Sequence, residues 1–145
     1  MGRQQSSLGE SSPAAAVETA DAVDISERFS ILLVDDSRVS LRGMVRVLRQ
    51  NWDVDIATDS DEALQLVNQR TYSVIITDCD MPGHNGLWLL EQIKNVSPQT
   101  IRVLASAGLH ERFAPHIKAG LIHVFLHKPL VNESLRTMLI GLMMR

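Results

Sequence analysis

Several features that often mark function are scarce or missing in this sequence of 145 residues. Its single cysteine, Cys79, excludes an internal disulfide and a zinc site built from several thiolates. The formal net charge of -3 leaves no basic excess that could neutralise a nucleic-acid backbone. No stretch approaches the ~18 consecutive apolar residues that suggest a membrane span. We therefore expect a cytoplasmic protein that contacts neither membranes nor nucleic acid directly.

The first part of the chain lacks a sustained apolar period. Residues 1–28 are rich in Ser, Ala, Gly, Gln and acids, and they contain no apolar core of a signal peptide. We predict that residues 1–28 form a disordered tail or linker. From residue 29 to residue 145 the chain has enough hydrophobic residues to build one domain of ordinary size.

Beyond residue 29, short apolar runs alternate five times with helical patterns. The predicted strands cover 31–34, 54–57, 74–76, 101–105 and 122–126, and the predicted helices lie near 41–48, 63–67, 87–94, 109–119 and 131–142. The strands are apolar on both faces, which indicates a parallel sheet covered by helices on each side. Asp59 and Glu62 form a potential capping box for the second helix, whereas Pro115 should kink the fourth helix or delay its start.

Polar residues follow four of the five predicted strands. Asp35 and Asp36 follow the first strand, Asp78 the third, Ser106 the fourth and Lys128 the fifth. In a parallel α/β sheet, the functional crevice lies at the carboxyl ends of the strands. We therefore expect these five side chains to line one crevice.

The chemistry of such a crevice points to a hard metal ion. Three converging carboxylates repel one another unless a cation neutralises them, and Mg²⁺ prefers oxygen ligands. With Mg²⁺ bound, Asp78 can act as an oxygen nucleophile toward a phosphoryl group, while Lys128 stabilises the negative charge of the transferring oxygens. Ser106 would donate a hydrogen bond to a phosphoryl oxygen.

Each residue also has an ordinary structural interpretation. Asp35 and Asp36 can cap the following helix, Ser106 can be a turn residue, and Lys128 can be a surface cation before a proline. Four such coincidences at the same ends of core strands are much less probable together than singly.

These residues together resemble the receiver domain of two-component response regulators and hybrid histidine kinases. The resemblance covers the chain from Phe29 onward and includes the Met-Pro-Gly loop after Asp78. It implies a doubly wound, CheY-like five-stranded parallel sheet of order 2-1-3-4-5 with helices on both faces. In that family the acidic pair binds Mg²⁺, matching Asp35 and Asp36, together with the phosphoacceptor, matching Asp78.

The remaining roles come from the same resemblance. The backbone carbonyl of Asp80 matches a further metal ligand, Ser106 and Lys128 match the hydroxyl and lysine of the phosphoryl site, and Phe125 matches the switch aromatic. A sensor histidine kinase or histidine phosphotransfer protein would donate the phosphoryl group. The gained charge would then shift the face of the fourth helix, fifth strand and fifth helix, through which two copies can pair.

Two other functions remain open at this point. A degenerate receiver would bind partners without phosphorylation, although none of its usual signs, a missing acid, acceptor or lysine, is present. A phosphatase resembling the haloacid dehalogenase family also uses an Asp-x-Asp motif, as in Asp78 to Asp80, but on its first strand. The resemblance implies at most self-catalysed phosphoryl transfer and autodephosphorylation. It does not imply a conventional metabolic enzyme.

Overall fold

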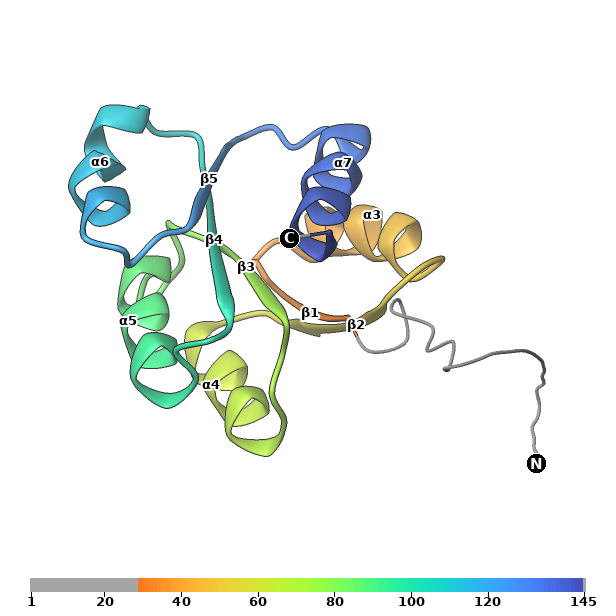
Figure 1. Ribbon diagram of the computed structural model, residues 1–145, viewed down its shortest axis with the longest axis horizontal. Helices are drawn as coiled ribbons and strands as arrows, with labels where there is room; N and C mark the ends of the chain where they lie inside the picture. Colours follow the sequence, from red (N-terminus) through yellow and green to blue (C-terminus); the bar gives the residue numbers. More distant parts are fainter. Residues whose placement is uncertain (1–28, 145) are drawn as a thin grey trace.

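A computed structural model describes residues 29–144. The tail predicted for residues 1–28 therefore lies outside the described residues. The five strands are β1 (Ser30–Val34), β2 (Asp53–Ala57), β3 (Val74–Asp78), β4 (Ile101–Ser106) and β5 (Val124–His127). All neighbouring strands pair in parallel, in the order β2-β1-β3-β4-β5 (Figure 1). The predicted fold and strand order are confirmed.

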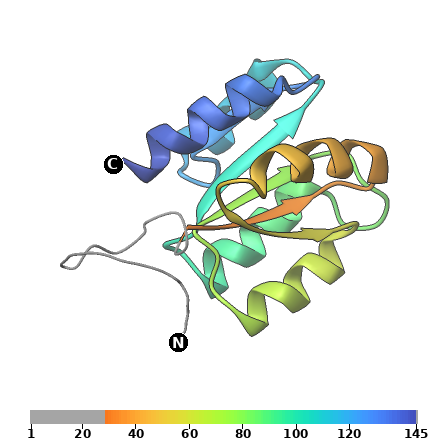
Figure 2. The same ribbon diagram turned by 90° about the vertical axis from the view of Figure 1, so that its right-hand side faces the viewer.

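Helices cover both faces of this sheet. They are α3 (Arg38–Leu48), α4 (Ser60–Gln69), α5 (Gly86–Val96), α6 (His110–Lys118) and α7 (Asn132–Met143). Helices α3 and α7 lie side by side over one face, and α4 and α5 lie side by side over the other (Figures 1 and 2). Helix α6 packs on the same face as α4 and α5, because its buried Phe113 belongs to their core cluster.

Alternate residues of each central strand supply the two halves of the core. In β1, Ile31 and Leu33 pack with α3 and α7, whereas Leu32 and Val34 pack with α4 and α5. Successive side chains of a strand point to opposite faces, so a strand covered on both sides must be apolar at every position. This requirement explains the uninterrupted apolar runs in the sequence.

Three of the five described helices have a polar N-cap. The side chains of Ser37, Asp59 and Asn85 each accept a hydrogen bond from a main-chain N–H in the first helical turn. The predicted capping box is present in modified form, because Glu62 accepts from the main-chain N–H of Thr58 at 2.7 Å. The N-cap of α3 is Ser37. Asp35 and Asp36, which could have capped this helix, do not.

The structure tests two sequence expectations near α6 and β5. We expected a helix near 109–119 in which Pro115 causes a kink or a delayed start; the helix begins at His110, ahead of the proline, and the kink stays a prediction. The start is not delayed, since Pro115 removes one internal hydrogen bond without preventing the first turn from forming. Strand β5 begins at Val124 and not at Ile122, because the N–H of Ile122 bonds to the His116 carbonyl and belongs to the turn that closes α6.

A buried arginine closes the turn between α6 and β5. Arg102 of β4 is only 3% exposed. Its guanidinium donates to main-chain oxygens of Leu121 at 2.9 Å, Gly120 at 3.0 Å, Pro98 at 3.1 Å and Thr100 at 3.2 Å. These bonds satisfy a buried cation that would otherwise be costly to place inside the protein.

Within residues 29–144, no helix combines the length and the apolar character needed to cross a membrane.

Ile75 at the centre of β3 tests the core. It is fully buried, so Ile75→Ala should lower the free energy of unfolding by about 2–5 kcal/mol, measured by urea denaturation. The matched control is Ile140→Ala on α7, where the side chain is 43% exposed and the loss should stay below about 1 kcal/mol. Equal losses for the two variants would contradict this arrangement of the core.

Candidate functional site

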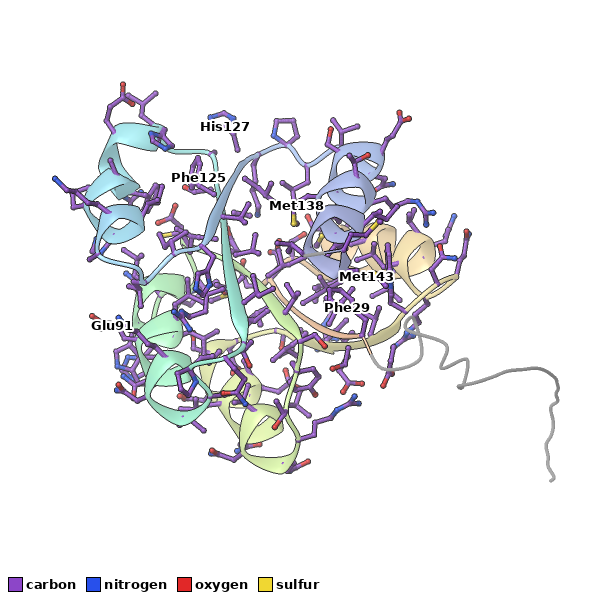
Figure 3. All side chains as sticks on the ribbon, in the orientation of Figure 1. Phe29, Glu91, Phe125, His127, Met138 and Met143 are labelled. Carbon is purple, nitrogen blue, oxygen red and sulfur yellow. The ribbon has the colours of Figure 1, made fainter. Side chains whose placement is uncertain are left out.

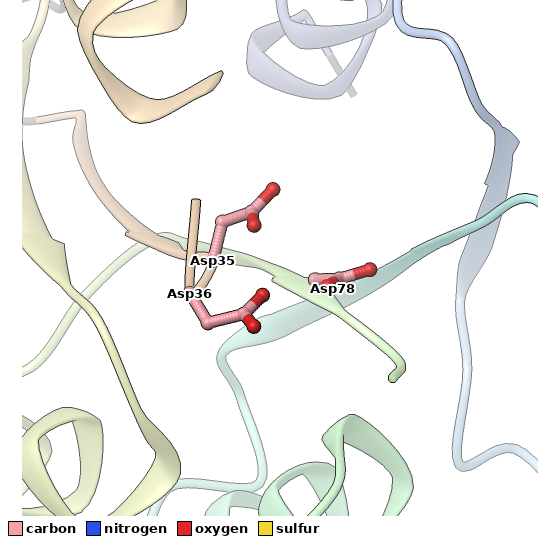
Figure 4. Close-up of side chains that lie close together, drawn as sticks. All are labelled: Asp35, Asp36 and Asp78. Atoms are coloured by element: carbon pink, nitrogen blue, oxygen red, sulfur yellow. The ribbon is translucent and has the colours of Figure 1, made fainter. Parts of the chain in front are cut away.

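Three carboxylates meet at the carboxyl ends of β1 and β3 (Figure 4). Asp35 and Asp36 directly follow β1, and Asp78 is the last residue of β3. One oxygen from each carboxylate lies within 4.8 Å of the other two. The pairing of β1 with β3 causes this proximity, since two adjacent parallel strands end at the same edge. Asp35 and Asp78 are buried, and Asp36 is exposed.

Lys128 reaches this group from the end of β5. Its Nζ lies 3.1 Å from Asp35 Oδ2 and 3.1 Å from Asp78 Oδ1. The main-chain N–H of Lys128 also donates to the Ser106 carbonyl at 2.9 Å, which holds the end of β5 against β4. The long lysine side chain thus crosses β4 to reach β3 and β1.

Burial and the charges of neighbouring residues both shift the pKa values of Asp78 and Lys128. Burial raises the pKa of Asp78, Lys128 partly offsets this, and Asp35 and Asp36 raise it further. Burial lowers the pKa of Lys128, but its hydrogen bonds and charge interactions with Asp78 and Asp35 outweigh burial, so that this pKa is raised. The lysine stays charged, and Asp78 would ionise more easily with another cation nearby.

The donor atoms of this group suit a hard divalent cation. All three side chains offer carboxylate oxygens, which Mg²⁺ prefers, and the exposed Asp36 leaves an approach from solvent. Asp35, Asp36 and Asp78 would hold the ion. The side chain of Asp80 lies apart from them and is 65% exposed. Its predicted role concerns the main-chain carbonyl and stays a prediction.

Ser106 lies at the carboxyl end of β4 and is only 1% exposed. Its Oγ accepts a hydrogen bond from the main-chain N–H of Gly108 at 2.9 Å. That contact is the turn role considered from the sequence, and it leaves the hydroxyl proton able to donate. The predicted bond to a phosphoryl oxygen remains a prediction.

Phe125 lies on β5 and is half-buried on the side of α6 (Figure 3). Its ring centroid is 5.2 Å from that of Phe113 and 5.7 Å from that of His110, both on α6. The predicted switch aromatic therefore joins β5 to α6 by ring contacts. Its switching role stays a prediction.

Gly86 is a residue whose importance the sequence did not indicate. It begins α5, its N–H donates to the Cys79 carbonyl at 2.8 Å, and a methyl group placed on it would overlap the main-chain oxygen of Asp78. Only a residue without a side chain allows α5 to start so close to the end of β3. The sequence signal was a glycine in a predicted loop, which does not reveal a close approach.

The strand order and the acidic crevice at its carboxyl edge define a doubly wound α/β domain of the CheY-like kind. Comparison with known proteins agrees: the sequence profile described as "Response regulator receiver domain" matches residues 31–140. A receiver domain structure from Clostridium thermocellum has a TM-score of 0.74 at 25% identity, covering 81% of this chain and 95% of that one.

Curated relatives carry the same match. The chain is 32% identical over 120 residues to the sensor protein EvgS of Escherichia coli K12, covering 79% of this chain and 10% of EvgS. It is 32% identical over 120 residues to an uncharacterized response regulatory protein of Staphylococcus epidermidis, covering 77% of this chain and 45% of that protein. The chain thus spans less than half the length of these relatives. It belongs to the response regulator receiver domain family.

Gly86→Ala should lower the free energy of unfolding by about 1–3 kcal/mol, because the added methyl group must displace the main chain at Asp78. Gly43→Ala on α3 is the matched control. Its methyl group would meet nothing within 4 Å, and alanine favours a helix over glycine by about 1 kcal/mol. Urea denaturation should therefore separate the two variants in opposite directions, and stabilisation by Gly86→Ala would contradict the close approach.

The raised pKa of Asp78 predicts how stability depends on pH without divalent cations. The folded protein binds a proton at Asp78 more tightly than the unfolded chain does. In the unfolded chain the pKa of this carboxyl group has its ordinary value of 3.8. The contribution of Asp78 to the free energy of unfolding should therefore fall as pH rises from 3.8 through the folded pKa. Asp78→Asn removes this titration, so the difference in stability between the two proteins should shift in favour of the variant as pH increases. Parallel pH profiles for the two proteins would show that the pKa is not raised.

Proposed function

We propose that Asp78 accepts a phosphoryl group from the phosphohistidine of a sensor histidine kinase or a histidine phosphotransfer protein. The observation that carries this proposal is the position of the Asp78 carboxylate, which lies beside Asp35 and Asp36 and 3.1 Å from Lys128. Membership of the receiver family supports it, because receiver domains pair with histidine kinases.

In the proposed reaction, an Asp78 carboxylate oxygen attacks the phosphorus atom. A phosphorus–oxygen bond forms, the phosphorus–nitrogen bond of phosphohistidine breaks, and the leaving imidazole nitrogen keeps the electron pair. Mg²⁺ bound by Asp35, Asp36 and Asp78 would neutralise charge on the phosphoryl oxygens. Lys128 Nζ is already close enough to Asp78 to bind an oxygen of the new acyl phosphate. The chain's own residues thus supply the catalysis, whereas the partner supplies the phosphoryl group.

The switch would begin at Ser106. Its hydroxyl group would donate to a phosphoryl oxygen, and Phe125 would then change its packing against Phe113 and His110 of α6. Because Phe125 belongs to β5, this repacking would alter the face formed by α6, β5 and α7. We propose this face as the surface through which the phosphorylated protein contacts its target or a second copy.

Acetyl phosphate tests the acceptor directly. The wild type should gain one phosphoryl group by intact mass in the presence of Mg²⁺ and none after chelation, because the three acids need a cation. Asp78→Asn should abolish the gain. The matched control is Asp80→Asn, which removes a nearby exposed acid while keeping the main-chain carbonyl, and it should still be labelled.

Labelling of Asp78→Asn to the wild-type level would show that another residue is the acceptor. An unlabelled wild type would instead indicate a receiver that binds its partners without phosphorylation.

A further inference from the structure

Arg112 is a cation that contacts the two residues directly after β3. It lies in the first turn of α6, and its side chain is 50% exposed. One guanidinium nitrogen lies 3.4 Å from Asp80 Oδ1 and 4.0 Å from Cys79 Sγ. Cys79 and Asp80 directly follow Asp78. Arg112 therefore stands beside the segment that carries the proposed acceptor.

The surroundings of Gly108 show that the same guanidinium group lies near the Ser106 hydroxyl group. A Cβ atom on Gly108 would lie 3.3 Å from Ser106 Oγ and 3.4 Å from Arg112 Nη1. The hydroxyl oxygen and the guanidinium nitrogen thus face one small space that glycine leaves open. Ser106 is also the residue proposed to donate to a phosphoryl oxygen.

The charge of the site indicates what Arg112 could bind. With Mg²⁺ present, the metal and Lys128 together balance the charges of Asp35, Asp36 and Asp78. Converting the Asp78 carboxylate to an acyl phosphate adds further negative charge. The ion pair between Arg112 and Asp80 is exposed to solvent, and its nitrogen–oxygen distance is 3.4 Å. Such a pair holds the guanidinium group only weakly.

We propose that Arg112 is a second phosphoryl-binding cation, which leaves Asp80 and binds the phosphoryl oxygens once Asp78 is phosphorylated. A guanidinium group suits this task because its planar donors match phosphate oxygens in pairs. The inference rests on the proposed function of Asp78. Asp80 holds Arg112 in the resting protein, and the phosphoryl group then competes with Asp80 for it.

The position of Arg112 would transmit the change to α6. Its guanidinium carbon lies 4.8 Å from the centre of the Phe113 ring, which stacks on Phe125. Movement of the guanidinium toward the phosphoryl group would remove this contact and pull on the first turn of α6. The proposed site would then act on α6 directly, in addition to its effect through Ser106 and Phe125.

Calorimetric titration tests the proposal with beryllium fluoride, a tetrahedral analogue of the phosphoryl group. Mg²⁺ is titrated first, and beryllium fluoride is then titrated at saturating Mg²⁺. Arg112→Gln should weaken beryllium fluoride binding about tenfold, the loss expected for one charge-assisted contact. The same variant should bind Mg²⁺ equally or more tightly, because a nearby positive charge has been removed. Damage to the fold would weaken both.

Two further variants sharpen the test. Lys118→Gln removes one positive charge from an exposed position of α6 and should leave both affinities at the wild-type level. Arg112→Lys keeps the charge without the planar donors and should lie between the wild type and Arg112→Gln.

The outcomes separate this inference from the proposed function. Wild-type affinity for beryllium fluoride in Arg112→Gln, or an equal loss in Lys118→Gln, would overturn the role of Arg112 while leaving Asp78 as the acceptor. If the wild type binds Mg²⁺ but neither beryllium fluoride nor the phosphoryl group of acetyl phosphate, the proposed function fails, and the role of Arg112 fails with it.

Discussion

The contact of Lys128 with two buried carboxylates is the interaction on which the crevice depends. Its ammonium group lies 3.1 Å from both Asp35 and Asp78. Without a cation, two acids that are each under 10% exposed would be costly to ionise side by side. The lysine offsets part of that cost but leaves the pKa of Asp78 raised. The crevice therefore suits one more cation.

The sheet creates this crevice through main-chain pairing. Strands β1 and β3 are neighbours, so Asp35 and Asp78 must end at the same edge. The N–H of Cys79 bonds to the Ala105 carbonyl at 3.0 Å, which continues the β3–β4 pairing just beyond Asp78. Gly86 then lets α5 begin against the Asp78 carbonyl. Main chain from β4 and from the start of α5 thus lies against the segment that carries Asp78.

A chain of contacts leads from the residues after β3 to α6 and β5. Arg112 and Phe113 are consecutive residues of α6, so one helical turn contacts both Asp80, two residues after Asp78, and the aromatic ring of Phe125. Buried Arg102 fixes the other end of α6 by binding the carbonyls of the turn that follows it. Fully buried Phe113 holds the first turn of α6 in the core, whereas the neighbouring Arg112 is held only by an exposed ion pair with Asp80.

The sequence alone determined the alternation of strands and helices, because burial on both faces requires apolar runs and burial on one face requires helical spacing. It also placed Asp35, Asp36, Asp78, Ser106 and Lys128 at strand ends, since such positions can be read along the chain. The order of the strands came from family resemblance, and the tertiary structure confirmed it.

Contacts between distant segments could be decided only by the tertiary structure. The sequence placed the start of β5 too early, because the turn before this strand depends on hydrogen bonds to β4 and to the end of α6. Nothing in the local pattern distinguished Gly86 from another loop glycine or Arg112 from another exposed arginine. Their importance depends on which main-chain and side-chain atoms folding brings within a few ångströms, and hydrophobic periodicity contains no record of such distances.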